Sequence, residues 1–184
     1  NRLLKLKINT PKPIAFFEFK KNGLVDGSYY ITEQLDYDLT YRDLNINLEY
    51  PNHENILRAF TRFTNKLHRN NILFLDHSPG NTLIVKQPNS YLFFLVDLNR
   101  MSFRDLSLKD QIYNFKRLSI HSSVVSIMSD ELSKLIDLDF DKTYKMMWAA
   151  TQKFQYQFQR KKYFKNKFKL WAKKFILKTK TNNF

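Results

Sequence analysis

Aromatic and β-branched side chains concentrate in two segments near the start of the chain. Residues 14–20 (IAFFEFK) and 28–35 (SYYITEQL) have the composition that favours strands. Between them the chain carries two dipeptides typical of tight turns, Asn-Gly at 22–23 and Asp-Gly at 26–27. This pattern predicts a β-hairpin whose turn lies between the two segments.

The hydrophobic period changes to that of a helix in residues 53–69. The apolar positions three and four residues apart are Ile56, Leu57, Phe60, Phe63 and Leu67. Asn52 is placed to cap the start of this helix, and Asn71 can take the left-handed conformation that ends it. The sequence therefore predicts one amphipathic helix with a buried face.

Short strands and then mostly helices are predicted beyond this point. The segment ILFLD and the polar loop HSPGN lead into strands at 82–86 and 91–96, which a Gln-Pro-Asn-Ser turn makes antiparallel. The later helices are expected from about Ser107, over 121–137 and over 141–178. Asp110 stands at the third helical position after Ser107, which resembles a capping box.

Composition places the chain among ordinary globular proteins. Hydrophobic residues make up 43% and charged residues 26% of the 184 positions, which argues against disorder. Cysteine is absent, which excludes disulfides and thiolate metal sites and fits a reducing cytoplasm. No run of about 18 apolar residues and no secretory leader is visible. The first residue is Asn1 rather than Met.

The formal charge of +14 is concentrated at one end. Residues 141–184 hold 13 Lys or Arg and one acid, whereas residues 1–140 hold 18 basic and 16 acidic residues. Such asymmetry indicates a polyanionic partner, either a membrane or a nucleic acid.

The strongest chemical signal is a loop followed by a hairpin. Asp76 is followed five residues later by Asn81, and Asp97 ends the second strand of the predicted hairpin, so it returns beside Asn81. Kinases use an Asp and an Asn at this spacing, one for the hydroxyl proton and one for Mg²⁺. A carboxylate and an amide oxygen suit Mg²⁺. The competing interpretation is a surface loop in which these residues only begin and end strands.

LFLDHSPGNTLI and FLVDLNRM resemble the catalytic loop and metal-binding segment of the lipopolysaccharide kinase (Kdo/WaaP) family. The resemblance implies an α+β, protein-kinase-like fold and ATP-dependent phosphorylation of a Kdo or heptose hydroxyl in the lipopolysaccharide inner core. It assigns Asp76 as catalytic base, with Asn81 and Asp97 binding the Mg²⁺ of the nucleotide. YYITEQLDYDL resembles the hinge, where the backbone around Glu33 and Leu35 would meet adenine.

The resemblance also implies a division of the chain. Residues 1–35 would be a partial N-lobe with the hinge strand, 36–159 a mostly helical C-lobe, and 160–184 a basic aromatic tail. Phe74 stands where protein kinases carry a His, and Asn99 replaces the Gly of their metal motif. The Gly-rich phosphate loop, the strand Lys and the helix Glu have no counterparts here. We therefore expect a fragment of a longer kinase with little activity by itself, the alternative being a degenerate kinase.

The tail carries ten Lys or Arg and no acid between residues 160 and 180. Phe164, Phe168, Trp171 and Phe175 would share one helical face. A basic helix of this kind suits the surface of an anionic bilayer. The resemblance implies which one, because lipopolysaccharide core assembly occurs on the cytoplasmic face of the inner membrane; we therefore expect a peripheral protein there. Packing of this face on the domain is the alternative, and nucleic-acid binding is disfavoured.

Other functions stay open at this point. Kinases of aminoglycosides or choline share the D-x-x-P-G-N loop, and a catalytically inactive nucleotide-binding module would lack a phosphate loop. His77 would be either exposed or in contact with substrate. Asp36 and Asp38 would either contact the ribose or be solvated. The phosphorylated hydroxyl and the oligomeric state cannot be derived from these residues.

Overall fold

The computed structural model describes residues 2–181, with side chains described as far as residue 168. The elements are α1 (Arg2–Lys5), β1 (Pro13–Lys21), β2 (Leu24–Thr32), β3 (Leu39–Thr40), α2 (Tyr41–Ile46), α3 (His53–Arg69), β4 (Ile72–Phe74), β5 (Thr82–Gln87), β6 (Ser90–Leu95), β7 (Met101–Phe103), α4 (Leu108–Tyr113), the 3₁₀ helix η1 (Asn114–Arg117), α5 (Ser122–Leu135) and α6 (Phe140–Thr181). The described strands form three small antiparallel sheets, β1-β2, β3-β5-β6 and β4-β7. The predicted α+β class is confirmed.

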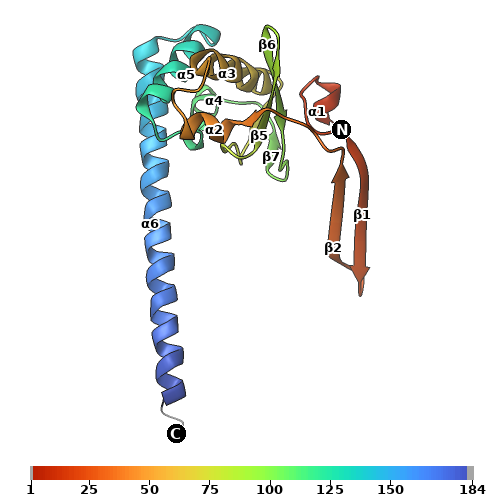
Figure 1. Ribbon diagram of the computed structural model, residues 1–184, viewed down its shortest axis with the longest axis vertical. Helices are drawn as coiled ribbons and strands as arrows, with labels where there is room; N and C mark the ends of the chain where they lie inside the picture. Colours follow the sequence, from red (N-terminus) through yellow and green to blue (C-terminus); the bar gives the residue numbers. More distant parts are fainter. Residues whose placement is uncertain (1, 182–184) are drawn as a thin grey trace.

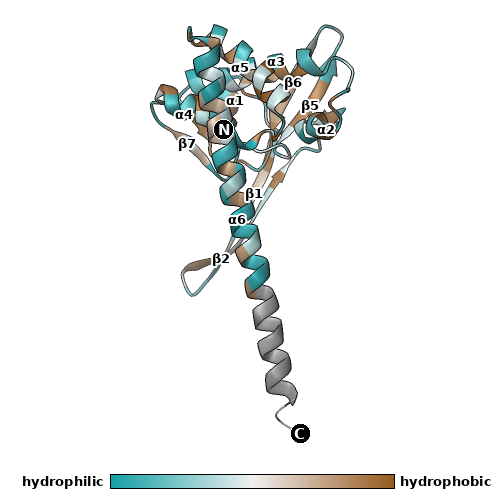
Figure 2. Ribbon diagram, turned by 90° about the vertical axis from the view of Figure 1, so that its left-hand side faces the viewer, coloured by the Kyte–Doolittle hydropathy of each residue, from teal (hydrophilic) through white to brown (hydrophobic). Residues whose placement is uncertain are grey.

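A helical body occupies the centre of the molecule, and two elements project from it (Figure 1). Helices α3 and α5 and the start of α6 pack together, with the small sheets beside them. The hairpin β1-β2 extends on one side and the long helix α6 leaves on the other. Polar and apolar residues alternate along the projecting part of α6 that is coloured by hydropathy (Figure 2).

Two buried clusters fix the loop between β4 and β5. The larger cluster is centred on Phe60 of α3, whose ring lies 4.4 Å from that of Tyr41 and 5.5 Å from that of Phe93. The smaller cluster contains Leu3, Ile8, Leu67, Ile72, Phe74 and Leu95. Phe74 is fully buried there at the end of β4, so the loop that follows starts from a rigid position.

The predicted β1-β2 hairpin is confirmed, but its turn is tighter than expected. Asn22 and Gly23 both have positive φ, as a two-residue hairpin turn requires. The Asp-Gly pair at 26–27, predicted as part of the turn, lies inside β2 instead. There the register shifts between Phe19, which pairs with Gly27, and Lys20, which pairs with Val25, so the extra residue forms a bulge.

Helix ends follow the predicted capping in part. The capping box at Ser107 is present, with its Oγ accepting from the Asp110 N–H at 3.2 Å. Asn71 has φ of 58°, in the left-handed conformation expected after α3. Asn52 does precede α3, but it adopts φ of 60° and its side chain forms no capping hydrogen bond. A positive φ directs the side chain away from the first turn, which explains the missing cap.

Helix α6 packs on the body only through its first half. Met147, Ala150 and Thr151 are buried, whereas residues 156–168 are exposed. For residues 160–168 the alternative that the aromatic face packs on the domain is therefore wrong. Trp171 and Phe175 lie outside the described side chains. Within residues 2–181, no helix has the length and apolarity needed to cross a bilayer.

Candidate functional site

The loop after β4 is folded tightly by its own hydrogen bonds. The Asn81 N–H donates to the Ser78 carbonyl at 3.0 Å, and the Asn81 amide donates to the Asp76 carbonyl at 2.9 Å. A Cβ on Gly80 would lie 2.5 Å from Nη2 of Arg42, the end of a flexible side chain that can move aside, so this contact does not by itself require glycine. Because the Asn81 side chain uses its amide nitrogen in the bond to the Asp76 carbonyl, its Oδ1 remains available as an acceptor at the loop surface.

Strand pairing brings Asp97 to the same place. Thr82 pairs with Leu95, and the Val96 N–H donates to the Asn81 carbonyl at 3.1 Å, so Asp97 is the next residue along. Asp97 itself has φ of 54°, a conformation that costs energy for most residues other than Gly, Asn and Asp. The predicted return of Asp97 beside Asn81 is present in the backbone.

Asn99 has a role that the sequence pattern did not indicate. Its amide donates to Oδ1 of Asp97 at 2.9 Å. This bond orients the Asp97 carboxylate and leaves its other oxygen available. The replacement of a glycine by Asn99 therefore adds a polar contact at the position where we expected only a change in loop geometry.

A cavity of about 510 Å³ opens between the β1-β2 hairpin and the segment that carries Asp97. Its lining residues are Thr10, Pro11, Phe16, Ser28, Tyr30, Thr32, Val96, Asp97, Leu98 and Asn99. This volume lies within the range of cofactor pockets, and apolar walls with few polar groups are typical of them. Asp97 is thus the predicted site residue that reaches the cavity directly. Asp76, Asn81, Glu33 and Leu35 do not line it.

The predicted hinge follows the hairpin without regular structure. The Glu33 N–H already donates to the Lys12 carbonyl at 2.8 Å. Asp38 is occupied as well, because its carboxylate accepts from the Lys86 N–H at 2.7 Å and its own N–H donates to the Ile84 carbonyl. Asp38 therefore fixes the edge of β5, and the suggested contact with a ribose has no support from this geometry.

The donor set suits a magnesium ion held partly by its nucleotide. Among residues 2–168, no group of three or more His, Cys, Asp or Glu side chains could hold a metal by itself. The Asp97 carboxylate and the Asn81 amide oxygen are hard oxygen donors. Mg²⁺ ordinarily binds through one or two such groups and completes its shell with water and phosphate oxygens. These residues fit that ion.

Arg117 is the principal site residue that the sequence pattern missed. Its guanidinium forms an ion pair with Oδ1 of Asp76 and lies 5.4 Å from the ring centroid of Phe154 on α6. Among the described residues Oδ2 of Asp76 has no bonded partner. No spacing could have indicated Arg117, since it lies 41 positions after Asp76 and only the fold brings the two together.

His77 is fully buried, so both sequence interpretations, an exposed side chain or a substrate contact, are wrong. Its ring packs against Phe60, Phe74 and Phe115. Burial, with His68 and Arg117 nearby, lowers the pKa of His77 to about 3. Asn114 supports the same region by donating to the Phe74 carbonyl at 2.8 Å and bonding His68 at 3.1 Å.

The buried His77 should make the protein sensitive to acid. The unfolded chain binds a proton near pH 6.5 and the folded chain only near pH 3. Stability is therefore complete above pH 6.5 and falls as pH drops through this window, by about 2 kcal/mol at pH 5. Urea unfolding at pH 7 and pH 5 measures it. His77→Leu and His77→Gln should both flatten this dependence; an unchanged loss in both variants would contradict the assignment.

The comparisons with known proteins agree with this geometry. The family model described as the lipopolysaccharide kinase (Kdo/WaaP) family matches residues 1–138. The chain belongs to this family. No curated protein matches it. Among solved structures, one described as WaaP in complex with acyl carrier protein is 13% identical with a TM-score of 0.58, covering 86% of this chain and 72% of that one.

Membership in the Kdo/WaaP family confirms the resemblance and the protein-kinase-like fold. At 13% identity the likeness to WaaP shows the fold alone. The family makes the chain a kinase-like phosphotransferase of lipopolysaccharide biosynthesis, a chemistry that implies a nucleotide and a divalent metal.

Proposed function

We propose that the protein transfers the γ-phosphoryl group of ATP to a Kdo or heptose hydroxyl of the lipopolysaccharide inner core. One observation supports this most strongly. In a member of the Kdo/WaaP family, a single tight loop holds Asp76 and Asn81, and the Val96–Asn81 bond brings Asp97 next to Asn81. Of these three residues, Asp97 lines a cavity of cofactor size. This arrangement supports the assignment of the three residues to phosphoryl transfer.

Each residue would have a separate task. Asp76 would accept the proton of the attacking hydroxyl through the carboxylate oxygen that Arg117 leaves unbonded. Asn81 and Asp97 would hold Mg²⁺, which when bound neutralises charge on the phosphates. Since the Glu33 N–H is already used, adenine would meet the Glu33 carbonyl and the Leu35 N–H.

Family membership favours this substrate over an aminoglycoside or choline. The intact Asp76, Asn81 and Asp97 argue against an inactive nucleotide-binding module. We also propose that the basic part of α6 holds the protein on the cytoplasmic face of the inner membrane, where its lipid-linked acceptor would lie. Acyl carrier protein, present in the WaaP structure, is a further partner to test by direct binding.

Asp97→Ala tests the metal site. The variant should weaken binding of Mg-ATP by at least tenfold in isothermal titration, because a carboxylate ligand is lost, while thermal unfolding stays near that of the parent. Glu49→Ala, which removes an exposed carboxylate outside the cavity, is the matched control. Equal Mg-ATP affinity in parent and Asp97→Ala proteins would remove Asp97 from the metal site.

Arg117→Ala tests the positioning of Asp76. Without the ion pair the carboxylate can rotate, so we expect kcat to fall about tenfold with little change in the KM for ATP. Arg117→Lys keeps the charge and should recover part of the loss. A fall of similar size in both variants, or a loss that appears only in KM, would show that Arg117 does not act through Asp76.

A further inference from the structure

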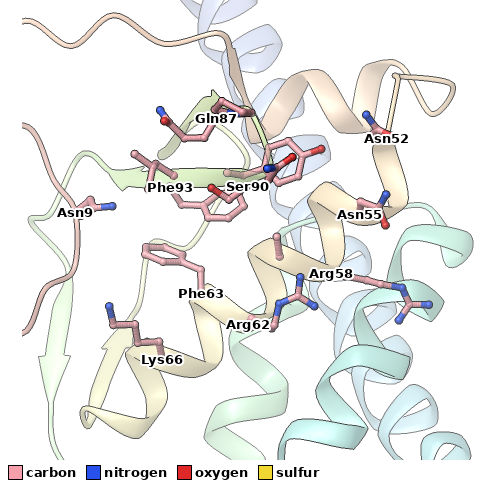
Figure 3. Close-up of a pocket in the computed structure, with 15 residues that line it drawn as sticks. Asn9, Asn52, Asn55, Arg58, Arg62, Phe63, Lys66, Gln87, Ser90 and Phe93 are labelled. Atoms are coloured by element: carbon pink, nitrogen blue, oxygen red, sulfur yellow. The ribbon is translucent and has the colours of Figure 1, made fainter.

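A second groove shares no lining residue with the Asp97 cavity. It has a volume of about 690 Å³ and lies between helix α3 and strand β6 (Figure 3). Phe63 points from α3 toward Phe93 of β6, and the two ring centroids are 5.4 Å apart. Asn9 closes one end, and the turn between β5 and β6 borders the other.

Strand β6 is an edge strand whose free side faces this groove. The sheet order is β3-β5-β6, so β6 has a partner strand on one side. The Leu95 N–H donates to the Asn9 carbonyl rather than to β5. Because backbone direction alternates along a strand, the N–H and C=O groups of Phe93 and Tyr91 also point away from β5. The described residues provide no partner for these groups.

The chain itself supplies one bond of an additional strand and then turns away. Asn9 bonds Leu95, but Pro11 and the start of β1 at Pro13 carry the backbone toward the hairpin. Unpaired edge groups are the template to which extended peptides add as a further strand. The edge left at Tyr91 and Phe93 offers room for about four residues of such a peptide, at roughly 3.4 Å each.

The charged residues that line the groove favour a peptide of opposite charge. Its charged lining residues are Arg58, Arg62 and Lys66, all from α3, and no acidic side chain lines it within residues 2–168. Arg58 is already paired with Glu54, Asp130 and Glu131. Arg62 shares Glu131 but keeps 53% of its side chain exposed, and Lys66 donates only to the Lys7 carbonyl.

The spacing of the two available cations matches that of an extended chain. Arg62 and Lys66 are one helical turn apart, about 6 Å along the α3 axis. Side chains two positions apart on the same face of a strand are separated by about 6.8 Å. Two acidic residues separated by one residue in an extended peptide could therefore meet both cations.

We propose that this groove binds an extended acidic peptide, which adds as a strand to the edge of β6 and places an acid-x-acid pair against Arg62 and Lys66. The site is independent of the phosphotransfer proposal, because it uses neither Asp76 nor the Asp97 cavity. Its occupant would be an acidic segment of another protein.

Fluorescence anisotropy with a labelled ten-residue peptide of alternating Glu and Val tests the proposal. The full chain should bind it, and a peptide with Lys in place of Glu should not bind. Arg62→Gln with Lys66→Gln should weaken binding at least tenfold. The matched control, Lys142→Gln with Lys145→Gln on α6, removes the same charge outside the groove and should bind as the parent does.

A second pair of measurements tests the backbone contact. Tyr91→Pro removes an outward N–H without disturbing the bonds to β5, and should weaken binding at least tenfold. Should this variant not fold, the parent protein can be tested with a peptide N-methylated at every residue, which has no backbone N–H to donate from either edge and should not bind. Equal affinity for the N-methylated peptide would overturn the proposal. So would binding of an acidic oligosaccharide together with no binding of the peptide.

Discussion

Replacing Asp76 by asparagine is expected to lower turnover by roughly 10²–10⁴, the usual contribution of a positioned base. Asparagine keeps the size of the side chain and can still accept one hydrogen bond, but it cannot take the proton of the attacking hydroxyl. In the proposed site ATP would bind in the cavity, which Asp76 does not line, so the affinity for ATP should change little. Phosphorylation of an inner-core acceptor by the parent and variant proteins is the measurement.

The loss of the ion pair with Arg117 is a second consequence of this substitution. Asp76→Glu is therefore a useful companion variant, because it restores a carboxylate with altered reach and should recover part of the activity. Phosphorylation at near-parental rates by Asp76→Asn would exclude Asp76 as the base. A drop confined to ATP affinity would instead assign Asp76 to nucleotide binding.

Local patterns predicted the elements that depend on neighbours in sequence. The period of α3, the hairpin β5-β6 and the capping box at Ser107 rest on residues a few positions apart, and all are present. Asp26-Gly27 was misinterpreted because an Asp-Gly pair suits a bulge as well as a turn. The short α2 and the two-residue β3 had no periodic signal, since neither is long enough to repeat a pattern.

The site residues also fall into two groups, those that a local pattern can predict and those that only tertiary packing brings together. Asp76, Asn81 and Asp97 could be proposed because one loop and one hairpin connect them. Arg117 could not, because its contact with Asp76 depends on how η1 packs against the loop. The burial of His77 has the same origin: three aromatic rings from different elements enclose it, and no local pattern distinguishes it from an exposed loop histidine.

The second large expected effect is salt-dependent binding of the protein to anionic membranes. The protein should cosediment with anionic vesicles at 0.1 M salt and be released at 1 M salt. Each Lys or Arg near an anionic surface contributes about 1 kcal/mol, so four of the ten in residues 160–180 would favour the bound state by close to a thousandfold. Salt should remove most of this, since the Debye length falls from about 10 Å to about 3 Å.

The structure makes truncation after Gln159 a clean test. The buried residues in the described part of α6 all precede the cut, and residues 160–168 are exposed. These buried residues are Thr143, Met147, Ala150 and Thr151. The truncated protein should therefore fold and lose vesicle binding. Lys161→Glu with Lys162→Glu keeps the helix and should weaken binding as well, which separates charge from length. Unfolding of the truncated protein would show that the tail stabilises the domain, and binding to RNA without binding to vesicles would assign the basic surface to nucleic acid.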